Sequence, residues 1–400
     1  MLVILFWGAM ALIVYTYVLF PAAVLIRGRW FRRPYRNAEI TPTVSMIVVA
    51  HNEAGSIGAK LDNLLSLEYP RDKLEVLVAS DGSTDATEGI VRGYAKHGVR
   101  LLALPRQGKI SVLNAAVAVA TGDVLVFSDA NSMFSPGAIR ALVRPLADPE
   151  IGGVAGDQRY LDEDRQVNAG ERTYWSFDRM LKVAQSAAGS VTSATGAIYA
   201  IRRRLFRDVP PGVTDDFANS TGVIARGYRL VFASDAVAYE PVAKSSRLEF
   251  ARKSRVITRG LCGVLARREL LNPWRHGFYA LQLFSHKVVR RLVVFPLLIL
   301  LLVSPWLWTH GWPYQLATVG QLAFYGCGLL GKLLEETRVG RVRLFALPHY
   351  FCMVYFASLV AALRVLRGYR IDLWEPQRDE DEGRAADGLV ATAPAERSLL

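Results

Sequence analysis

Three short acidic segments hold the side chains of this chain that are best suited to chemistry. They are Ser80-Asp81-Gly82-Ser83, Ser128-Asp129-Ala130-Asn131 and Thr214-Asp215-Asp216. A carboxylate at the end of a buried strand can hydrogen-bond a polar ligand or bind a hard divalent cation, and a carboxylate can also take a proton from an attacking hydroxyl. The three segments together predict one site with three tasks: ligand binding, metal binding and general base catalysis.

The segment at Asp81 follows an apolar run that we expect to be a strand. Asp, Ser and Thr at such a turn commonly cap the next helix through their side-chain oxygens. The alternative is that Asp81 hydrogen-bonds a nucleoside, as an acidic residue near a strand end does in dinucleotide-binding folds. Asn52 and Glu53 follow the preceding predicted strand in the same way. Since ligands of open parallel sheets bind outside the carboxyl ends of the strands, we expect Asn52, Glu53 and Asp81 to contribute to one nucleotide site.

Asp129 and Asn131 lie between a predicted strand and a helix that should begin at Ser135-Pro136, where Ser caps the helix and Pro takes its first position. Mg²⁺ commonly takes only one or two carboxylates plus substrate phosphates, so a single Asp with a neighbouring amide is sufficient. Such an ion would offset the negative charge that grows on a leaving diphosphate. We expect Asp129 and Asn131 to hold Mg²⁺ or Mn²⁺; an ordinary capped turn is the alternative.

Asp215 and Asp216 precede a predicted helix from Phe217 to Arg226. Two carboxylates at a helix start are favoured by the helix dipole and could be no more than caps. As a general base, one of them would accept the proton of an attacking hydroxyl, which typically contributes about 10²–10⁴ in rate. The other two acidic segments favour the catalytic interpretation.

Three basic residues could bind phosphate groups. Lys109 follows Gly108 at a predicted helix start, where a solvent-exposed Lys is also common. Arg252 and Arg255 come just before the apolar C-terminal part of the chain, so they either clamp a diphosphate or serve as interfacial charge. The sequence leaves both interpretations open.

From Pro42 onward, apolar runs alternate with segments of helical spacing, which predicts strand-helix-strand units. This pattern is typical of an α/β domain with a mainly parallel sheet. The strands are expected at residues 44–50, 74–79, 99–104 and 124–128, and the helices between them at residues 54–67, 85–97 and 109–120.

Both ends of the chain are strongly apolar. Met1 to Ile26 has no charge and exceeds the roughly 20 apolar residues that cross a bilayer, and basic residues follow it at 27–36. A signal peptide would have its basic residues first, so we predict an uncleaved anchor whose C-terminal end is cytosolic. Three further segments are each long enough to cross, namely residues 288–308, 314–334 and 345–366.

An odd number of crossings after a cytosolic domain would place the end of the chain outside, but Arg364, Arg367 and Arg370 favour the cytosol. We therefore expect one C-terminal segment to be re-entrant or interfacial. Residues 274–286 mix aromatic, basic and apolar side chains, which predicts a helix at the membrane surface.

The predicted organisation is that of a multi-pass protein of the inner (plasma) membrane. It comprises an anchor with its basic flank (residues 1–36), a cytosolic domain (37–270), an interfacial helix with transmembrane segments (271–370) and a disordered tail (371–400).

The composition agrees with this organisation. The chain has 400 residues, of which 52% are hydrophobic, and a net charge of +12. Its basic residues gather beside apolar segments, where they set the topology and contact anionic headgroups, so nucleic acid is not an expected partner. The three cysteines form neither a disulfide framework nor a zinc spacing, which is typical of a reducing compartment.

The order of the motifs resembles the family 2 glycosyltransferases, the membrane-bound inverting group that includes cellulose, hyaluronan and poly-N-acetylglucosamine synthases. The residues that carry the resemblance are Val49-Ala50-His51-Asn52-Glu53, Asp81, Gly108-Lys109 with Asn114, Asp129-Ala130-Asn131 and Asp215-Asp216. The resemblance covers about residues 44–260. It implies a GT-A type nucleotide-sugar-binding domain flanked by transmembrane helices, a UDP-sugar donor, Asp216 as the base, and an acceptor site lined by the segment around Gly196.

The chain departs from the processive synthases at their Gln-x-x-Arg-Trp motif. The aligned stretch, Arg252-Lys253-Ser254-Arg255-Val256, keeps the Arg but lacks the Gln and the Trp. The resemblance places that Trp at the acceptor sugar, so Val256 marks the acceptor side and puts processive synthesis in doubt. We expect transfer of a sugar from a nucleotide-sugar to a saccharide or lipid-linked acceptor at the cytosolic membrane face, in exopolysaccharide or glycolipid synthesis. The alternatives are a processive synthase that also translocates its polymer, and a membrane-anchored nucleotide-sugar binder without catalysis.

Overall fold

The computed structural model describes residues 1–161, 169–241, 246–335, 337–340 and 342–368. Within these residues, one mixed sheet forms the centre of the molecule, with the strand order β3-β2-β1-β4-β7-β6-β8-β5. The strands are β1 Val44–Ala50, β2 Leu74–Asp81, β3 Val99–Leu104, β4 Val124–Asp129, β5 Met133–Phe134, β6 Ile151–Leu161, β7 Tyr199–Arg202 and β8 Arg229–Pro241.

Only half of this sheet is uniformly parallel. β3, β2, β1 and β4 run in one direction, so the carboxyl ends of β1, β2 and β4 lie along one edge. β7 runs antiparallel to β4 and β6, β6 and β8 are parallel to each other, and β5 is antiparallel to β8. The prediction of a mainly parallel sheet is therefore wrong for the second half. After β4 the regular alternation of strand and crossover helix ends, so successive strands are no longer forced into one direction.

Helices cover both faces of the sheet. They are α3 Ala54–Leu65, α4 Thr87–Gly93, α5 Lys109–Val119, α6 Ala138–Val143, α7 Ala169–Ala188, α8 Asp215–Ala225 and α9 Ser246–Ala266. Met46 and Val48 of β1 belong to the core under α3 and α6, whereas Ile47 and Val49 belong to the core under α5 and α8. Burial on both faces explains why β1 is an almost continuous apolar run in the sequence.

The helices predicted in the first half of the domain are confirmed with small shifts at their ends. The second of them is shorter than expected, because α4 is followed by a separate 3₁₀ turn at Ala95–His97. α8 begins at Asp215 instead of Phe217, with Thr214 as its cap residue. Asp215 and Asp216 therefore lie in the first turn of a helix, which fixes the directions of both side chains.

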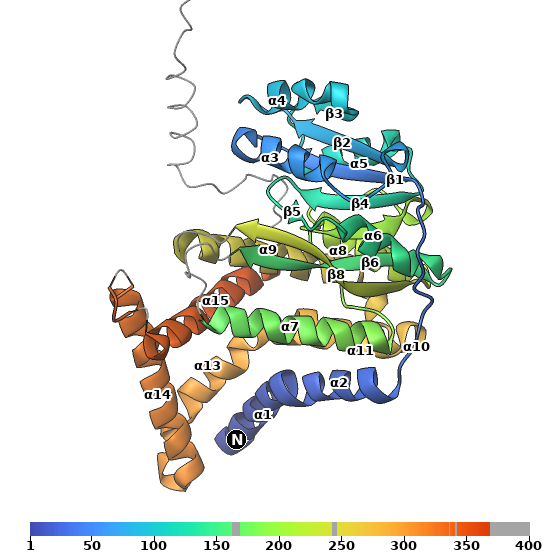
Figure 1. The fold of residues 1–400 in the computed structure, drawn as a ribbon. Coiled ribbons are helices and arrows are strands. Elements are labelled where there is room, and N and C mark those ends of the chain that lie inside the picture. The colour runs from blue at the N-terminus through green and yellow to red at the C-terminus, as the bar shows by residue number, and fades with distance from the viewer. Residues whose placement is uncertain (162–168, 242–245, 336, 341, 369–400) are drawn as a thin grey trace, which may run out of the picture.

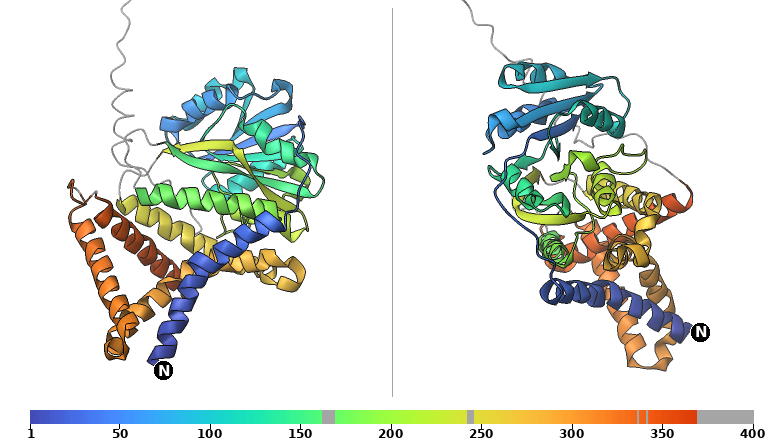
Figure 2. Two further views of the ribbon diagram at one scale, coloured as in Figure 1. Left: turned by 60° about the horizontal axis from the view of Figure 1, so that its bottom comes forward. Right: turned by 90° about the vertical axis from the view of Figure 1, so that its right-hand side faces the viewer.

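The N-terminal helix is continuous over Leu2–Trp30 but bends at a π-turn. α1 (Leu2–Val14) packs against α13 (Val294–Val303), and α2 (Phe20–Trp30) packs along α7. Figures 1 and 2 show α2 running beneath the sheet domain while α1, α13 and α14 (Trp312–Leu333) point away from it. The domain thus sits on a layer of helices from which a smaller apolar bundle projects.

Among the described residues, two helices are long and apolar enough to cross a membrane, Leu2–Trp30 and α15 (Arg343–Leu366). The predicted segment 288–308 is not one helix: it consists of the end of a π-turn, the short α12 (Arg290–Leu292), α13 and a 3₁₀ turn at Pro305–His310. The predicted surface helix 274–286 is likewise divided, because Gly277 separates α10 (Pro273–His276) from α11 (Phe278–Leu283). The tail predicted to be disordered, residues 371–400, lies outside the described residues.

α15 lies along α9 of the sheet domain. The rings of Phe250 and Phe356 stack with their centroids 5.7 Å apart, and Arg364 donates a hydrogen bond to Ser254 Oγ at 3.1 Å. Ala357 and Ala361 are fully buried in the same contact. One C-terminal helix is thus packed on the domain, and the prediction that a C-terminal segment is re-entrant or interfacial stays a prediction.

Candidate active site

A cavity of about 740 Å³ opens between the sheet and the helices beneath it. Asp129 at the end of β4 and Asp216 in the first turn of α8 both line it, as do Gly196 and three residues of α9, namely Arg252, Arg255 and Val256. The side of the cavity away from the sheet is formed by α15 and by the π-turn at Phe284–Val289. The structure therefore brings together predicted residues that come from four distant segments of the chain.

Lys109 connects two of the acidic segments. Its Nζ donates to Asp129 Oδ1 at 2.8 Å and lies 3.3 Å from Asp215 Oδ1. Burial alone would raise the pKa of Asp129, but the Lys109 ammonium holds it below the ordinary value. The two carboxylates in turn raise the pKa of Lys109 despite the opposing effect of burial. Lys109 and Asp129 are therefore both ionised at neutral pH.

Asp216 differs from its neighbour Asp215 in its surroundings. It lines the cavity, whereas Asp215 is buried against Lys109. Burial and the adjacent Asp215 carboxylate raise the pKa of Asp216 above the usual aspartate value. A carboxylate with a raised pKa in a cavity is a better proton acceptor than one neutralised by a lysine. The geometry thus distinguishes the two adjacent acids.

The space beside Asp129 suits a hard divalent cation. A Cβ added to Gly196 would lie 3.1 Å from Asp129 Oδ2, so the glycine leaves that oxygen accessible. Glu240 and Gln158 supply further oxygens to the same cavity, and burial together with the Asp129 charge raises the pKa of Glu240. Oxygen donors of this kind fit Mg²⁺ or Mn²⁺. Asn131 is exposed and does not line the cavity, so its role as a ligand stays a prediction.

The described residues contain no group of three or more His, Cys, Asp or Glu side chains arranged to hold a metal ion. An ion at Asp129 would therefore depend on the phosphates of a substrate to complete its coordination. This matches the usual behaviour of Mg²⁺, which keeps few protein ligands.

Asp81 lies outside the cavity and is fully buried. Its Oδ1 accepts hydrogen bonds from the backbone N–H groups of Gln107 at 2.8 Å and Gly108 at 3.0 Å, and its Oδ2 pairs with Arg106. The carboxylate thus fixes the loop that ends at Lys109. Its predicted contact with a nucleoside stays a prediction.

Asn52 and Glu53 also form contacts between loops. Asn52 has a positive φ of 53°, and its Oδ1 accepts a hydrogen bond from the backbone of Thr84 at 2.8 Å. The Glu53 backbone N–H donates to Thr87 Oγ1 at 2.7 Å, and the Glu53 carboxylate accepts from Ser56 Oγ. Both residues join the ends of β1 and β2, and neither lines the cavity. Their predicted role in donor binding is not tested by this arrangement.

On α9, Arg252 contacts Tyr160 Oη at 3.2 Å and forms an ion pair with Glu249 at 3.0 Å. Arg255 faces Asp129, whose charge opposes the lowering of the Arg255 pKa by burial and by neighbouring arginines. Val256 is 49% exposed and lines the cavity. The two arginines line the same cavity as Asp129 and Glu240, and their predicted contact with a diphosphate stays a prediction.

Lys60 supports the site from behind, and the sequence prediction missed it. It is fully buried beneath Asp129, donates to Ser128 Oγ at 2.7 Å and lies 4.2 Å from the centre of the Phe134 ring. Burial lowers the pKa of Lys60 to about 7, although Asp129 and Glu240 oppose the shift. The sequence signal for Lys60 is its position on the apolar face of α3, three residues after Ile57.

Glu240 was missed as well, although it is the penultimate residue of β8 and so lies near a strand end, as Asp129 does. The side chains of Asp178, Lys182, His286, Lys287 and Arg290, which line the other end of the cavity, were also not predicted as site residues. The sequence places the last three only in the predicted surface helix or among the basic residues beside the apolar segments.

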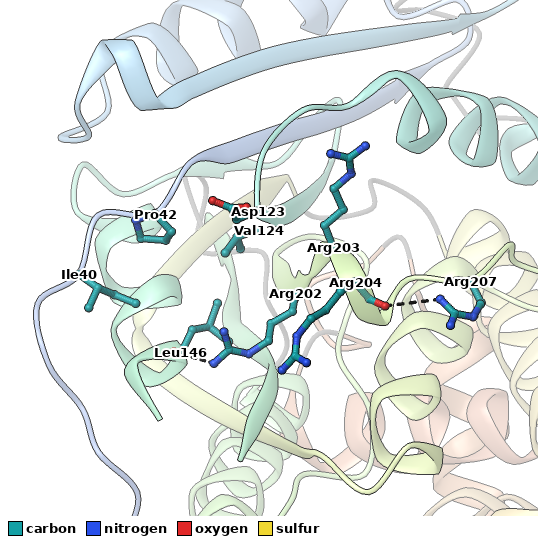
Figure 3. A pocket seen from close by; sticks show the side chains of 9 residues that line it. All are labelled: Ile40, Pro42, Asp123, Val124, Leu146, Arg202, Arg203, Arg204 and Arg207. Atoms are coloured by element: carbon teal, nitrogen blue, oxygen red, sulfur yellow. Dashed lines mark hydrogen bonds between the residues drawn. The ribbon is translucent and has the colours of Figure 1, made fainter. Parts of the chain in front are cut away.

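A second cavity, of about 630 Å³, lies at the opposite edge of the sheet, where β4 begins. Figure 3 shows its arginine-rich lining. Arg202 donates to the carbonyls of Leu146 at 2.7 Å and Ile151 at 2.8 Å, and Arg207 donates to the carbonyl of Phe206 at 2.7 Å. Asp123, the carboxylate in this lining, accepts from Thr43 Oγ1. These contacts support the fold and do not form a second acid–base site.

Residues 45–209 match the family model described as glycosyl transferase family 2. Among curated proteins, the chain is 25% identical over 226 residues to a poly-beta-1,6-N-acetyl-D-glucosamine synthase of Staphylococcus aureus (strain MSSA476), covering 54% of this chain and 53% of that protein. It is 28% identical over 239 residues to the probable glycosyltransferase YdaM of Bacillus subtilis (strain 168), covering 55% of each. The chain thus spans about half the length of the curated relatives it matches.

Among solved structures, the fold is similar to the mannosyltransferase PcManGT from Pyrobaculum calidifontis in complex with GDP-Man and Mn²⁺. The TM-score is 0.68 and the sequence identity is 26%, and the match covers 90% of this chain and 99% of that one. This likeness includes most of the helices beneath the sheet as well as the sheet domain.

Proposed function

Residues 45–209 form a family 2 glycosyltransferase domain with a GT-A-like fold, and from this premise we propose that the protein is an inverting, metal-dependent enzyme of the cytosolic membrane face. It is a nucleotide-sugar-dependent glycosyltransferase related to polysaccharide synthases. The proposed reaction transfers the sugar to a hydroxyl of a saccharide or lipid-linked acceptor. The proposed setting is exopolysaccharide or glycolipid synthesis.

The observation that carries this proposal is the position of Asp216 in the same cavity as Asp129. Asp216 is the proposed base, because its pKa is raised and it lines the cavity. In an inverting transfer the hydroxyl attacks the anomeric carbon from the side opposite the leaving diphosphate. That reaction needs a base beside the attacking hydroxyl and a diphosphate-binding group beside the leaving group.

Binding of the donor diphosphate is assigned to the metal side of the cavity. Asp129 and Glu240 would hold Mg²⁺ or Mn²⁺, with Asn131 as a further predicted ligand, and Arg252 and Arg255 would contact the phosphates. The ion, when bound, supplies positive charge against the charge that develops on the leaving group. Lys109 keeps Asp129 ionised and fixes its orientation.

The identity of the donor is open to experiment. The resemblance of the motifs favours a UDP-sugar, whereas the structurally similar mannosyltransferase was solved with GDP-Man and Mn²⁺. A test therefore needs both classes of nucleotide. Mn²⁺ in that complex supports the choice of a divalent cation here.

We assign the anchor (residues 1–36), the catalytic domain (37–270) and the C-terminal membrane region (271–370) as predicted from the sequence. The apolar helix Leu2–Trp30 supports the anchor. We further propose that α13, which has ten residues, and α14 form a helical hairpin that enters the bilayer. The catalytic domain and α15 would then lie on the cytosolic side of the inner (plasma) membrane.

A processive synthase is the second candidate, and the similarity to a poly-N-acetylglucosamine synthase favours it. Val256 in place of the Trp weakens it, since an aliphatic side chain offers no aromatic face for stacking on a sugar. A catalytically inactive binder is disfavoured because both Asp129 and Asp216 are present and line one cavity.

The experiment that separates these candidates measures the size and solvent partition of labelled product. Purified membranes receive Mg²⁺ or Mn²⁺ and a panel of labelled UDP-sugars and GDP-mannose, with Asp216→Asn membranes as the control. A small product that extracts into organic solvent supports the lipid-directed transferase. A large water-soluble product establishes a polymer synthase, and donor binding without any product supports the inactive binder.

A further inference from the structure

Lys60 of α3 is a buried cation that is held by neutral partners. Its Nζ donates to Ser128 Oγ at 2.7 Å and to the backbone carbonyl of Ser132, and it lies 4.2 Å from the centre of the Phe134 ring. In the described part of the chain, no carboxylate lies within ion-pair distance of this Nζ. A lysine is almost never fully buried unless it is paired, because its charge loses its hydration. The position of Lys60 therefore needs an explanation beyond the packing of α3.

The neutral partners of Lys60 belong to residues 128–134, the segment that carries the predicted metal ligands. Lys60 holds this segment at the Ser132 carbonyl. Asn63, nearly one turn further along α3, holds it at Phe134, whose backbone N–H donates to Asn63 Oδ1 at 2.8 Å and whose carbonyl accepts from Asn63 Nδ2 at 2.9 Å. Two side chains of α3, one charged and one neutral, therefore fix the backbone of this segment.

The same segment connects Lys60 to both carboxylates that are assigned to the divalent cation. Ser132 Oγ donates to Glu240 Oε1 at 2.6 Å, while the carbonyl of the same residue accepts from Lys60. Burial lowers the pKa of Lys60, whereas the charges of Asp129 and Glu240 raise it. Both carboxylates line the cavity and Lys60 does not. Lys60 therefore acts on the cavity only through Asp129 and Glu240.

A positive charge behind these carboxylates has two effects on metal binding. It offsets the repulsion between Asp129 and Glu240, so the two side chains can stay together without a cation between them. It also repels a divalent cation, which the carboxylates then bind less tightly than their own charge would allow. Lys109 differs from Lys60 in this respect, because the adjacent Asp215 balances its charge.

A nucleoside diphosphate changes the second effect. Its phosphates bring negative charge to the cation, so the complex of the two is no longer repelled by a nearby ammonium. The penalty that Lys60 imposes therefore applies to the free divalent cation and not to the cation that is bound to the donor diphosphate.

We propose that Lys60 is a positioning residue that weakens binding of the free divalent cation, so that Asp129 and Glu240 hold the cation firmly only together with a nucleoside diphosphate. This inference rests on the proposed function, which takes these two carboxylates as the metal-binding groups. Its consequence is that metal and nucleotide bind as a unit and leave as a unit after transfer, which frees the site for the next donor.

The test measures Mn²⁺ binding to the purified full chain in detergent by isothermal titration, first without nucleotide and then with UDP or GDP. Lys60→Met removes the charge and the hydrogen-bond donor, whereas Lys60→Gln removes the charge and keeps an N–H donor. Asn63→Ala is the matched control that loosens the same segment without changing its charge. Lys96→Met is the control for charge alone, because Lys96 is exposed on the turn at Ala95–His97 and does not line the cavity.

Without nucleotide, both Lys60 variants should bind Mn²⁺ about tenfold or more tightly than wild type, as expected when a nearby unit charge of the same sign is removed. Lys96→Met should match wild type, and Asn63→Ala should bind Mn²⁺ equally or more weakly. With UDP or GDP present, the gain in the Lys60 variants should disappear. Wild type should bind Mn²⁺ at least about tenfold more tightly with nucleotide than without it.

Unchanged or weaker binding of free Mn²⁺ in both Lys60 variants would overturn the inference, because a residue that only supports the fold gives that result. An equal gain in Asn63→Ala would also overturn it, since loosening of the segment would then be the cause. The melting temperature shows whether Lys60→Met is folded, and Lys60→Gln replaces it in the test if it is not. The wild-type comparison needs no variant: equal Mn²⁺ affinity with and without nucleotide would contradict the role of Lys60.

Failure of the proposed function gives a different result. If wild type transfers no sugar to any acceptor while the Mn²⁺ affinities change as expected, the proposed reaction is wrong and the role of Lys60 stands. If wild type transfers sugar and neither Lys60 variant binds free Mn²⁺ more tightly, the proposed reaction stands and the role of Lys60 is wrong.

Discussion

At the scale of residues, Lys109 makes two adjacent aspartates unequal. Its ammonium neutralises Asp215 and Asp129, and it leaves Asp216 facing the cavity with a raised pKa. The sequence alone presents Asp215 and Asp216 as an equivalent pair. Their difference comes from the helix start at Asp215, which sends consecutive side chains in directions about 100° apart.

The pH dependence of transfer should reveal this difference. Asp216 must be ionised to accept a proton, so activity falls as the pH drops through its raised pKa. Asp215→Asn removes the like charge that helps to raise the pKa of Asp216, and the acidic limb of the kcat/KM profile should therefore move to lower pH. Asp123→Asn, at the opposite edge of the sheet, is the matched control and should leave the limb in place. A limb that stays fixed in Asp215→Asn would argue against Asp216 as the titrating base.

The metal assignment predicts a different defect for Asp129. Asp129→Asn removes the negative charge that favours a divalent cation, so donor affinity with Mn²⁺ should fall to the level measured with a chelator. Isothermal titration with the nucleotide product, with and without Mn²⁺, measures both values. Asn131→Ala tests the second predicted ligand in the same assay. If wild type binds the donor equally well with and without the chelator, the metal assignment is wrong.

At the scale of elements, the contact between α2 and α7 joins the N-terminal helix to the catalytic domain. Gly28 makes this contact possible, because a Cβ there would lie 2.6 Å from the carbonyl oxygen of Ala184. A backbone atom cannot move aside as a side chain can. The N-terminal helix is therefore held against the domain by close packing of small residues.

Gly28→Ala should destabilise the protein, and Gly8→Ala in the same continuous helix is the matched control, because nothing lies within 4 Å of its added Cβ. Overpacking typically costs about 1–3 kcal/mol, whereas replacing an unhindered helical glycine by alanine gains up to about 1 kcal/mol. The melting temperature in detergent should fall for Gly28→Ala and hold or rise for Gly8→Ala. Equal shifts in both variants would mean that α2 does not pack on α7 as described.

At the scale of the whole molecule, the domain that holds the active-site cavity rests on helices that pack against different partners. α1, α13 and α14 project together, and Trp7 Nε1 of α1 donates to Tyr314 Oη of α14 at 3.1 Å. α15 instead packs along α9. This packing supports the proposal that α15 stays on the same side as the domain, although it is apolar enough to cross.

Reporter fusions test this topology. A reporter inserted within the 3₁₀ turn at Pro305–His310 should be active outside the cytosol, since this turn joins α13 and α14 at the end away from the domain. A reporter fused after residue 368 should be cytosolic. An external location for the second reporter would show that α15 crosses the bilayer and that α9 and α15 do not stay in contact.

Much of the fold could be predicted from sequence because its first half is regular. The apolar run at 44–50 and the polar residues after each strand located one edge of the sheet and Asp129, whereas Asp216 was selected at a predicted helix start and by the family resemblance. The antiparallel strands could not be predicted, because no periodic pattern specifies the direction of β7. Lys60 was missed for a related reason: a single lysine on the apolar face of a helix gains its meaning from partners distant in sequence.

The most direct test of the account compares Asp216→Asn with wild type in two measurements on the same purified protein, the rate of sugar transfer and the affinity for the donor nucleotide. The account predicts a rate at least about 10² lower with an unchanged nucleotide affinity, because the variant loses the proton acceptor and keeps the donor site. Transfer at the wild-type rate in Asp216→Asn would contradict the central claim.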